Sequence, residues 1–166
     1  MSTDIFRPVG EDWVPVSASL ATGRRLVAMP MLALPAVAAA VVGATTSSTA
    51  VRVAATAGVV VLLVVAAVAW TWAGRNQRSW GYAEAEDDLL VTSGVLFKRL
   101  VAVPYGRMQF VDVSAGPLAR RLGYATVTLH TASTETAADV PGVPTEEARR
   151  LRNRLTELGE SHGAGL

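Results

Sequence analysis

The chain has 166 residues, of which 51% are hydrophobic and 17% are charged, and its formal net charge is +1. This length suits one domain, or a small domain with a membrane anchor. The chain contains no cysteine, which excludes disulfides, thiolate catalysis and cysteine-ligated metals. Its near-neutral charge lacks the strongly basic balance of nucleic-acid-binding proteins, so we expect no nucleic-acid partner.

Polarity divides the chain into four predicted segments. We expect a cytoplasmic N-terminal tail, a two-helix transmembrane hairpin, a cytoplasmic domain rich in strands and a disordered C-terminal tail, over residues 1–23, 24–78, 79–159 and 160–166. In the first segment, Pro8, Gly10 and Pro15 block a long helix. That segment is predicted either to be mobile or to rest on the membrane surface around residues 13–16.

The most hydrophobic part of the sequence is residues 53–72, twenty residues without a charge. At about 1.5 Å of rise per residue, a helix of this length spans about 30 Å, the hydrocarbon thickness of a bilayer. Trp70 and Trp72 lie where an aromatic belt is expected, and Arg75 and Arg78 follow at the level of the headgroups. Because valine occupies all sides of this helix, lipid suits it better than a small soluble core. We predict a membrane-spanning helix.

A second uncharged stretch, residues 26–44, precedes the first and carries Pro30 and Pro35. Pro30 falls in the first helical turn, where the loss of a backbone donor is harmless, whereas Pro35 predicts a kink. The alternative is a cleaved signal peptide. It is disfavoured by the long polar region ahead of the stretch, by the length of the stretch and by the second span that follows closely.

Arginine residues predict how this hairpin is oriented in the cell membrane. Arg24, Arg25, Arg75 and Arg78 flank its outer ends, and Arg52 lies in the connection. Because positive charge accumulates on the cytoplasmic side of membrane proteins, we expect both termini in the cytoplasm. Neither span contains Asp, Glu, Lys or His, the residues that usually mark a transporter or a proton path. The hairpin therefore indicates an anchor.

Beyond residue 79, the pattern changes to short strands separated by turn residues. We predict six strands, over residues 80–86, 89–92, 95–103, 108–113, 126–131 and 136–140. Residues 116–123 begin with Gly-Pro and end in Gly, which predicts one or two helical turns between the fourth and fifth strands.

A closing helix is predicted from Thr145 onward, because apolar residues recur on one face while arginines avoid it. The apolar face consists of Ala148, Leu151, Leu155 and Leu158. One such helix after several strands can cap the open end of a small bent sheet or barrel.

Six stretches of the second half closely resemble the bacterial PH-like domain of YdbS-type membrane proteins. They are residues 94–99 (GVLFKR), 103–109 (VPYGRMQ), 111–113 (VDV), 116–118 (GPL), 122–123 (LG) and 125–131 (ATVTLHT). The resemblance covers about residues 26–158, because the apolar hairpin fits the same architecture. It implies an α+β membrane protein in which a two-helix transmembrane hairpin is followed by a PH-like split β-barrel capped by a C-terminal helix. That barrel has seven strands, so a bent or divided first strand would supply the seventh.

The resemblance brings no catalytic site, and the residues themselves point to none. His130 with Asp112 would make an acid–base pair, but a strand histidine bonded to a neighbour is far commoner. Asp87 and Asp88 fit a solvated turn better than a cation site. No P-loop, dinucleotide-binding loop or nucleophile elbow is present. We therefore predict no enzymatic activity, no cofactor and no metal.

The leading functional prediction is an interaction module that recruits, or assembles with, another membrane protein at the inner leaflet. Its candidate surface is Tyr105, Arg107, Gln109 and Asp112. The resemblance implies a related membrane protein with repeated PH-like domains as the partner, or a second copy of this chain.

The alternative prediction is that the domain senses anionic lipid headgroups. Its candidate contacts are Lys98, Arg99, Arg120 and Arg121, each worth about 1 kcal/mol beside an anionic leaflet. These residues are equally consistent with ordinary solvated loop charges. From residue 79 onward, eleven acidic residues face nine basic ones, which argues against purely electrostatic lipid binding.

Overall fold

The computed structural model describes residues 5–8, 10–131 and 138–163. The chain divides into two compact units. One unit, residues 21–74, consists of most of two long helices. The other, which we call the β domain, joins Met1–Leu20 to Arg75–Leu166. The β domain is therefore interrupted in sequence by the helical unit.

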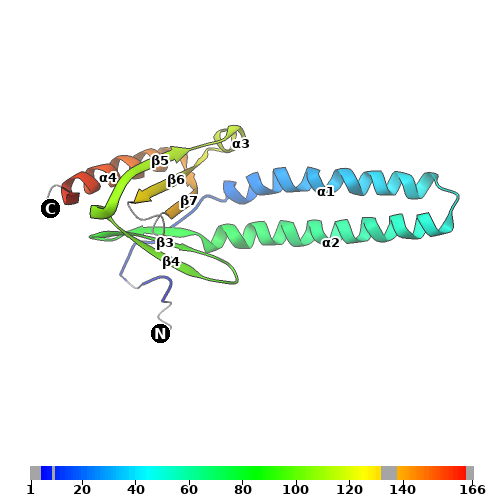
Figure 1. The fold of residues 1–166 in the computed structure, drawn as a ribbon, viewed down its shortest axis with the longest axis horizontal. Coiled ribbons are helices and arrows are strands. Elements are labelled where there is room, and N and C mark those ends of the chain that lie inside the picture. Colours follow the sequence, from blue (N-terminus) through cyan, green and yellow to red (C-terminus); the bar gives the residue numbers. More distant parts are fainter. Residues whose placement is uncertain (1–4, 9, 132–137, 164–166) are drawn as a thin grey trace. The chain divides into compact units, whose positions relative to one another are not determined.

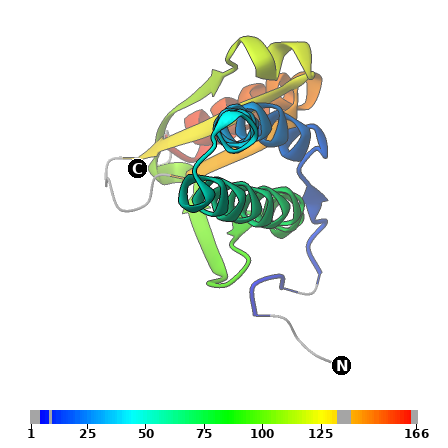
Figure 2. The same cartoon turned by 90° about the vertical axis from the view of Figure 1, so that its right-hand side faces the viewer.

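The two long helices, α1 (Ser19–Thr45) and α2 (Thr49–Ser79), lie side by side as a hairpin (Figures 1 and 2). Both are long and apolar enough to cross a membrane, and no residue of their most apolar windows is buried within the described structure. Each predicted span is found inside a longer helix. The predicted two-helix anchor is confirmed as a pair of apolar helices.

Two contacts join these helices near opposite ends of the hairpin. The Arg25 guanidinium donates hydrogen bonds of 3.2 and 3.3 Å to the Trp70 carbonyl oxygen and lies 4.2 Å from the centroid of the Trp70 ring. Near the connecting loop, a Cβ added at Gly43 would lie 3.1 Å from the Cβ of Ala55. Small residues there allow the two backbones to approach closely.

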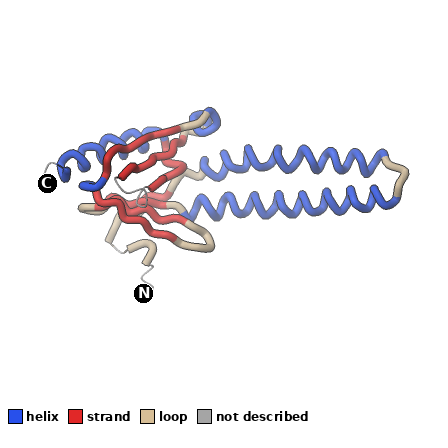
Figure 3. The backbone as a smooth tube through the Cα atoms, in the orientation of Figure 1, coloured by secondary structure: helices blue, strands red, loops and turns tan. Residues whose placement is uncertain are grey.

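The β domain contains two antiparallel sheets, with strand orders β1-β2-β3-β4 and β5-β6-β7 (Figure 3). The strands are β1 (Val14–Pro15), β2 (Gly81–Glu84), β3 (Asp88–Ser93), β4 (Arg99–Pro104), β5 (Met108–Ser114), β6 (Tyr124–Thr131) and β7 (Ala138–Pro144). The 3-10 helix η1 (Tyr105–Arg107) joins the two sheets, and α3 (Pro117–Arg121) joins β5 to β6. The α+β prediction is confirmed, but the sheets are not closed into the expected split barrel.

The seventh strand comes from the N-terminal segment rather than from a divided first strand. β1 pairs with β2 in antiparallel register. Val16 and Leu20 are buried in the core, and the side-chain amide of Gln77 donates a 2.7 Å hydrogen bond to the carbonyl of Val16. The prediction of a mobile or membrane-resting tail is wrong from Val14 onward, because these residues build the sheet and core before the chain enters α1.

The turn between β3 and β4 corrects a second prediction. Residues 94–98 form a turn, whereas a strand was predicted over residues 95–103. Gly94 has a φ of +100°, and a Cβ there would lie 1.9 Å from the carbonyl oxygen of Phe97. Only glycine fits this backbone, so the chain reverses at once instead of extending.

β7 also differs from the predicted strand over residues 136–140. It continues through Pro141 and Gly142 as far as Pro144. The register shifts opposite Ala125 and Thr126, so Gly142, with a φ of +79°, is accommodated as an extra residue of a β-bulge. Residues 136–137 lie outside the described residues.

The closing helix is α4 (Thr145–Gly163), which continues beyond the predicted end at Gly159. Residues 160–163 are therefore helical rather than disordered, and residues 164–166 lie outside the described part. The predicted apolar face is confirmed: Ala148, Leu151 and Leu155 are fully buried, and Leu158 packs against the core. Each fully buried leucine contributes about 1.5 to 3 kcal/mol.

Candidate functional site

Strand pairing gives the first sheet two distinct ends. At one end Ser93 pairs with Arg99, and Gly81, which follows α2 closely, pairs with Thr92. At the other end, Asp88 pairs with Pro104. The turn of residues 94–98 therefore lies at the end where the chain arrives from α2.

The short helix α3 lies at this same end of the β domain (Figure 1). The backbone N–H of Thr145 donates to the carbonyl of Gly123 just after α3, at 3.2 Å. The N–H of Ser17, just before α1, donates to the carbonyl of Gly142 at 2.7 Å. We call this region the helix-attached end, defined by residues 17–20, 78–80, 94–98 and 117–123.

The four predicted lipid contacts all lie at or beside the helix-attached end, but on different sheets. Lys98 ends the turn before β4 and Arg99 is the first residue of β4, while Arg120 and Arg121 belong to α3 between β5 and β6. All four side chains are exposed. They share one end of the domain without forming a single pocket.

Two further cations lie at this end: Arg78, which was predicted at the level of the headgroups, and Arg7, which was not predicted as a site residue. Arg7 and Arg78 line a recess of about 220 Å³ together with Lys98, whose ammonium lies 5.7 Å from the centroid of the Phe6 ring. Arg7 comes from the segment predicted to be a tail, and Arg78 from the end of α2. Only the pairing of distant segments brings Arg7 and Arg78 to Lys98, so no local sequence signal could have predicted this grouping.

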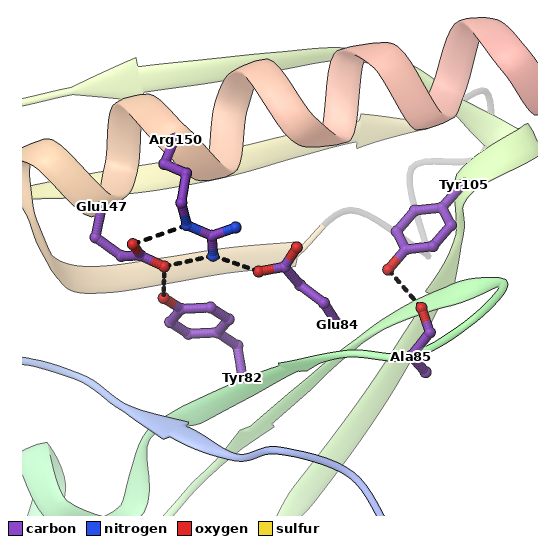
Figure 4. Close-up of polar contacts among 6 residues, drawn as sticks. All are labelled: Tyr82, Glu84, Ala85, Tyr105, Glu147 and Arg150. Atoms are coloured by element: carbon purple, nitrogen blue, oxygen red, sulfur yellow. Dashed lines mark hydrogen bonds and ion pairs between the residues drawn. The ribbon is translucent and has the colours of Figure 1, made fainter.

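The predicted protein-interaction surface is only partly exposed. Tyr105 is fully buried, and its hydroxyl donates a 2.9 Å hydrogen bond to the carbonyl of Ala85 (Figure 4). Burial raises the pKa of Tyr105 to about 12. Tyr105 is therefore a core residue and not part of a surface, which corrects the prediction. Arg107, Gln109 and Asp112 are exposed.

Gln109 lies on β5, which forms one edge of the second sheet. The register of β5 against β6 shifts between Met108 and Phe110, so Gln109 is an extra residue in a bulge. Between this strand and α4 is a groove of about 170 Å³, lined by Met108, Gln109, Phe110, Val111, Leu155, Thr156, Gly159 and Glu160. Of the predicted surface residues, only Gln109 lines this groove.

An aromatic pair lies beside the groove. Phe110 is 57% exposed and stacks on His130, with ring centroids 4.1 Å apart and an interplanar angle of 15°. The residue directly opposite Asp112 is Thr128, which donates a hydrogen bond to Asp139. His130 is therefore the stacking partner of Phe110, and Thr128 rather than His130 is the cross-strand partner of Asp112.

A polar network attaches α4 to β2 (Figure 4). The Tyr82 hydroxyl and the Arg150 guanidinium both donate to the carboxylate of Glu147, at 2.9 Å and 2.6 Å, and Arg150 also binds Glu84. Burial and the bond to Glu147 raise the pKa of Tyr82, while the hydrogen bond from Arg150 holds the pKa of Glu147 below its usual value. These contacts join α4 to β2 and hold the helix against the first sheet.

The described residues contain no group of three or more His, Asp or Glu placed to hold a metal ion.

Comparison with known proteins supports the resemblance seen in the sequence. The family model described as bacterial PH domain matches residues 26–159. The chain is 36% identical over 83 residues to the transmembrane protein YdbS of Bacillus subtilis strain 168, a stretch that covers 50% of this chain and 51% of YdbS. The match thus spans about half the length of that relative. No solved structure matches the chain.

Proposed function

This chain belongs to the bacterial PH domain family, and from that premise we propose that it is a non-enzymatic, membrane-anchored module that binds another membrane protein at the inner leaflet. The observation that carries this proposal is that β5 is an edge strand of the second sheet among the described residues, with a groove between it and α4. An edge strand presents backbone N–H and C=O groups that an extended segment of a partner can pair with. The adjoining groove can then receive a side chain of that segment.

The proposed partner is a related membrane protein with PH-like domains or a second copy of this chain. The flanking arginines support an arrangement with both termini and the β domain in the cytoplasm. Partners held in the same membrane meet at high effective concentration, so even a short β-pairing interface can be occupied.

Site-specific photo-crosslinking in intact membranes tests this function. A photoreactive residue replaces Gln109 on β5 in the full-length chain. In the matched control, the same photoreactive residue replaces Arg149, which is exposed on α4. We expect a discrete adduct, with a membrane protein or with a second copy, from position 109 alone. The proposal fails if position 109 gives no adduct, or the same adducts as position 149.

A specific observation favours a second candidate function, contact with anionic lipid headgroups. Lys98, Arg99, Arg120 and Arg121 all lie at or beside the end of the β domain where the chain passes to and from the apolar helices. Cations at such a position are attracted to an anionic leaflet within about one Debye length.

Hydrogen exchange of the full-length chain in lipid nanodiscs tests the second candidate. Anionic lipid should slow exchange of the amides of residues 94–99 and 117–122 relative to purely zwitterionic discs, and high salt should reverse the effect. In the double variant Arg120→Ala/Arg121→Ala, protection of residues 117–122 should be lost. Equal exchange in both lipids would exclude this function.

A further inference from the structure

We propose that the tip of the β3–β4 turn, Leu96 and Phe97, inserts into the interfacial region of the bilayer, with neighbouring cations contacting lipid phosphates. This inference deepens the lipid-contact function proposed above and rests on it. It adds two apolar residues, Leu96 and Phe97, to the charged residues already proposed to contact lipid.

The exposure of these two side chains is the first observation. Leu96 and Phe97 are 85% and 91% exposed, more than any other large hydrophobic residue in the described part of the chain. They are even more exposed than the apolar residues of α1 and α2, such as Leu34 at 72%. Adjacent large apolar side chains at the tip of a turn are typical of a surface that binds a membrane or a protein.

The backbone holds this tip in a defined shape. Gly94 has a positive φ, and the Phe97 carbonyl lies so close that no Cβ fits at position 94. The turn is flanked by the pairs Ser93–Arg99 and Thr92–Leu100 of the β3–β4 ladder. The apolar tip is therefore presented by a short turn between two paired strands, and such constraint lowers the entropic cost of inserting it.

Charge around the tip argues for a lipid rather than a protein occupant. Lys98 and Arg99 follow Phe97 directly, and Arg7 and Arg78 line the recess beside the turn. Cations from three segments therefore lie beside this turn: two follow the tip in sequence, and two share a recess with Gly94 and Lys98. An apolar tip with a basic rim is complementary to the boundary between acyl chains and anionic headgroups.

The place of the turn in the topology agrees with this occupant. Residues 94–98 lie at the helix-attached end, because Gly81, just after α2, pairs with Thr92 beside the turn. A chain anchored by α1 and α2 keeps this end of the domain within a few residues of the membrane-spanning segments. The connection to α1 and α2 therefore makes the bilayer the apolar environment that this tip can reach.

A depth-sensitive label tests the insertion, and the absence of cysteine in the chain makes single labelling direct. Phe97→Cys and, separately, Leu96→Cys are labelled with an environment-sensitive fluorophore in the full-length protein in nanodiscs. Each is measured in zwitterionic discs and in discs with anionic phospholipid. The matched control is Glu86→Cys, exposed in the turn between β2 and β3 at the opposite end of the sheet.

We expect a blue-shifted emission from positions 96 and 97 and quenching by nitroxides attached to the lipid chains, several-fold stronger than at position 86. Labels at both tip positions that behave like position 86 would overturn the insertion. A blue shift without lipid quenching would also overturn it, because it would place the tip against protein.

The two lipid proposals fail in distinguishable ways. If the basic segments are protected by anionic lipid but the tip labels stay unquenched, the headgroup function stands and insertion is wrong. If quenching is equal in zwitterionic and anionic discs, insertion stands and the anionic preference is wrong. The double variant Leu96→Asn/Phe97→Asn should restore fast exchange of residues 94–99 only if the tip inserts.

Discussion

The hydroxyl of Tyr82 donates a 2.9 Å hydrogen bond to the carboxylate of Glu147, which joins the strand after the second apolar helix to the closing helix of the domain. Arg150 holds the same carboxylate and also binds Glu84 on β2. Because β2 follows α2 directly, this network ties α4 to the strand through which the domain is connected to its anchor (Figure 4).

Removing this hydroxyl should destabilise the domain without unfolding it. Tyr82→Phe leaves the ring in the core but deletes a hydrogen bond to a charged acceptor, worth about 1.5 to 3 kcal/mol. We expect the free energy of unfolding of the full-length chain in detergent to fall by about this amount in chemical denaturation. The half-buried Tyr124 on β6 provides the control, and an equal loss in Tyr124→Phe would contradict a specific role for the network.

The pH dependence of stability should reveal the buried tyrosines. Because the pKa of Tyr105 is raised from 10.0 to about 12 in the folded state, its neutral form is favoured by folding. This contribution is complete below pH 10 and is lost as the pH rises toward 12, a loss of about 2 to 3 kcal/mol. Denaturation measured across this range should show a smaller loss in Tyr105→Phe than in the unsubstituted chain. Superimposable pH profiles would refute the assignment.

The N-terminal segment should be required for the stability of the β domain. Leu20 is buried and lies against Gly142, where an added Cβ would meet the Leu20 side chain at 2.8 Å. Leu20→Ala should therefore cost about 2 to 5 kcal/mol, and Gly142→Ala should be destabilising through both the clash and its positive φ. Thermal unfolding of the full-length chain measures both effects.

Val14→Ala provides the matched control for Leu20, because Val14 is exposed on the edge strand β1. It should change stability far less than Leu20→Ala. If Leu20→Ala were equally mild, residues 16–20 would not belong to the core.

Strong local patterns made the helices and several strands predictable from the sequence. Two uncharged stretches of membrane-spanning length gave α1 and α2, and the recurrence of Ala148, Leu151 and Leu155 gave the buried face of α4. β5 and β6 followed from apolar residues bounded by turn residues. These features depend on neighbours in sequence, which a single chain displays directly.

The features that the sequence did not predict depend on contacts between residues far apart in the chain. β1 has two residues, one of them proline, and pairs with Tyr82 and Gly81. The whole helical hairpin separates these partners in the sequence, so no local signal marks the strand. Leu96 and Phe97 suggested a strand because apolar residues normally face a core. The sequence predicts Tyr105 to be exposed in a turn, because it precedes Gly106 and Arg107. In the fold its side chain is buried in the core.

The proposed cytoplasmic placement of the β domain is tested most directly by the accessibility of single cysteines to a membrane-impermeant thiol reagent in intact cells. Ser47→Cys lies in the loop between α1 and α2, and Glu86→Cys lies in the β domain; both positions are exposed. We expect position 47 to react in intact cells and position 86 to react only after the membrane is permeabilised. Reaction of position 86 from outside, with position 47 protected, would contradict a domain held at the inner leaflet.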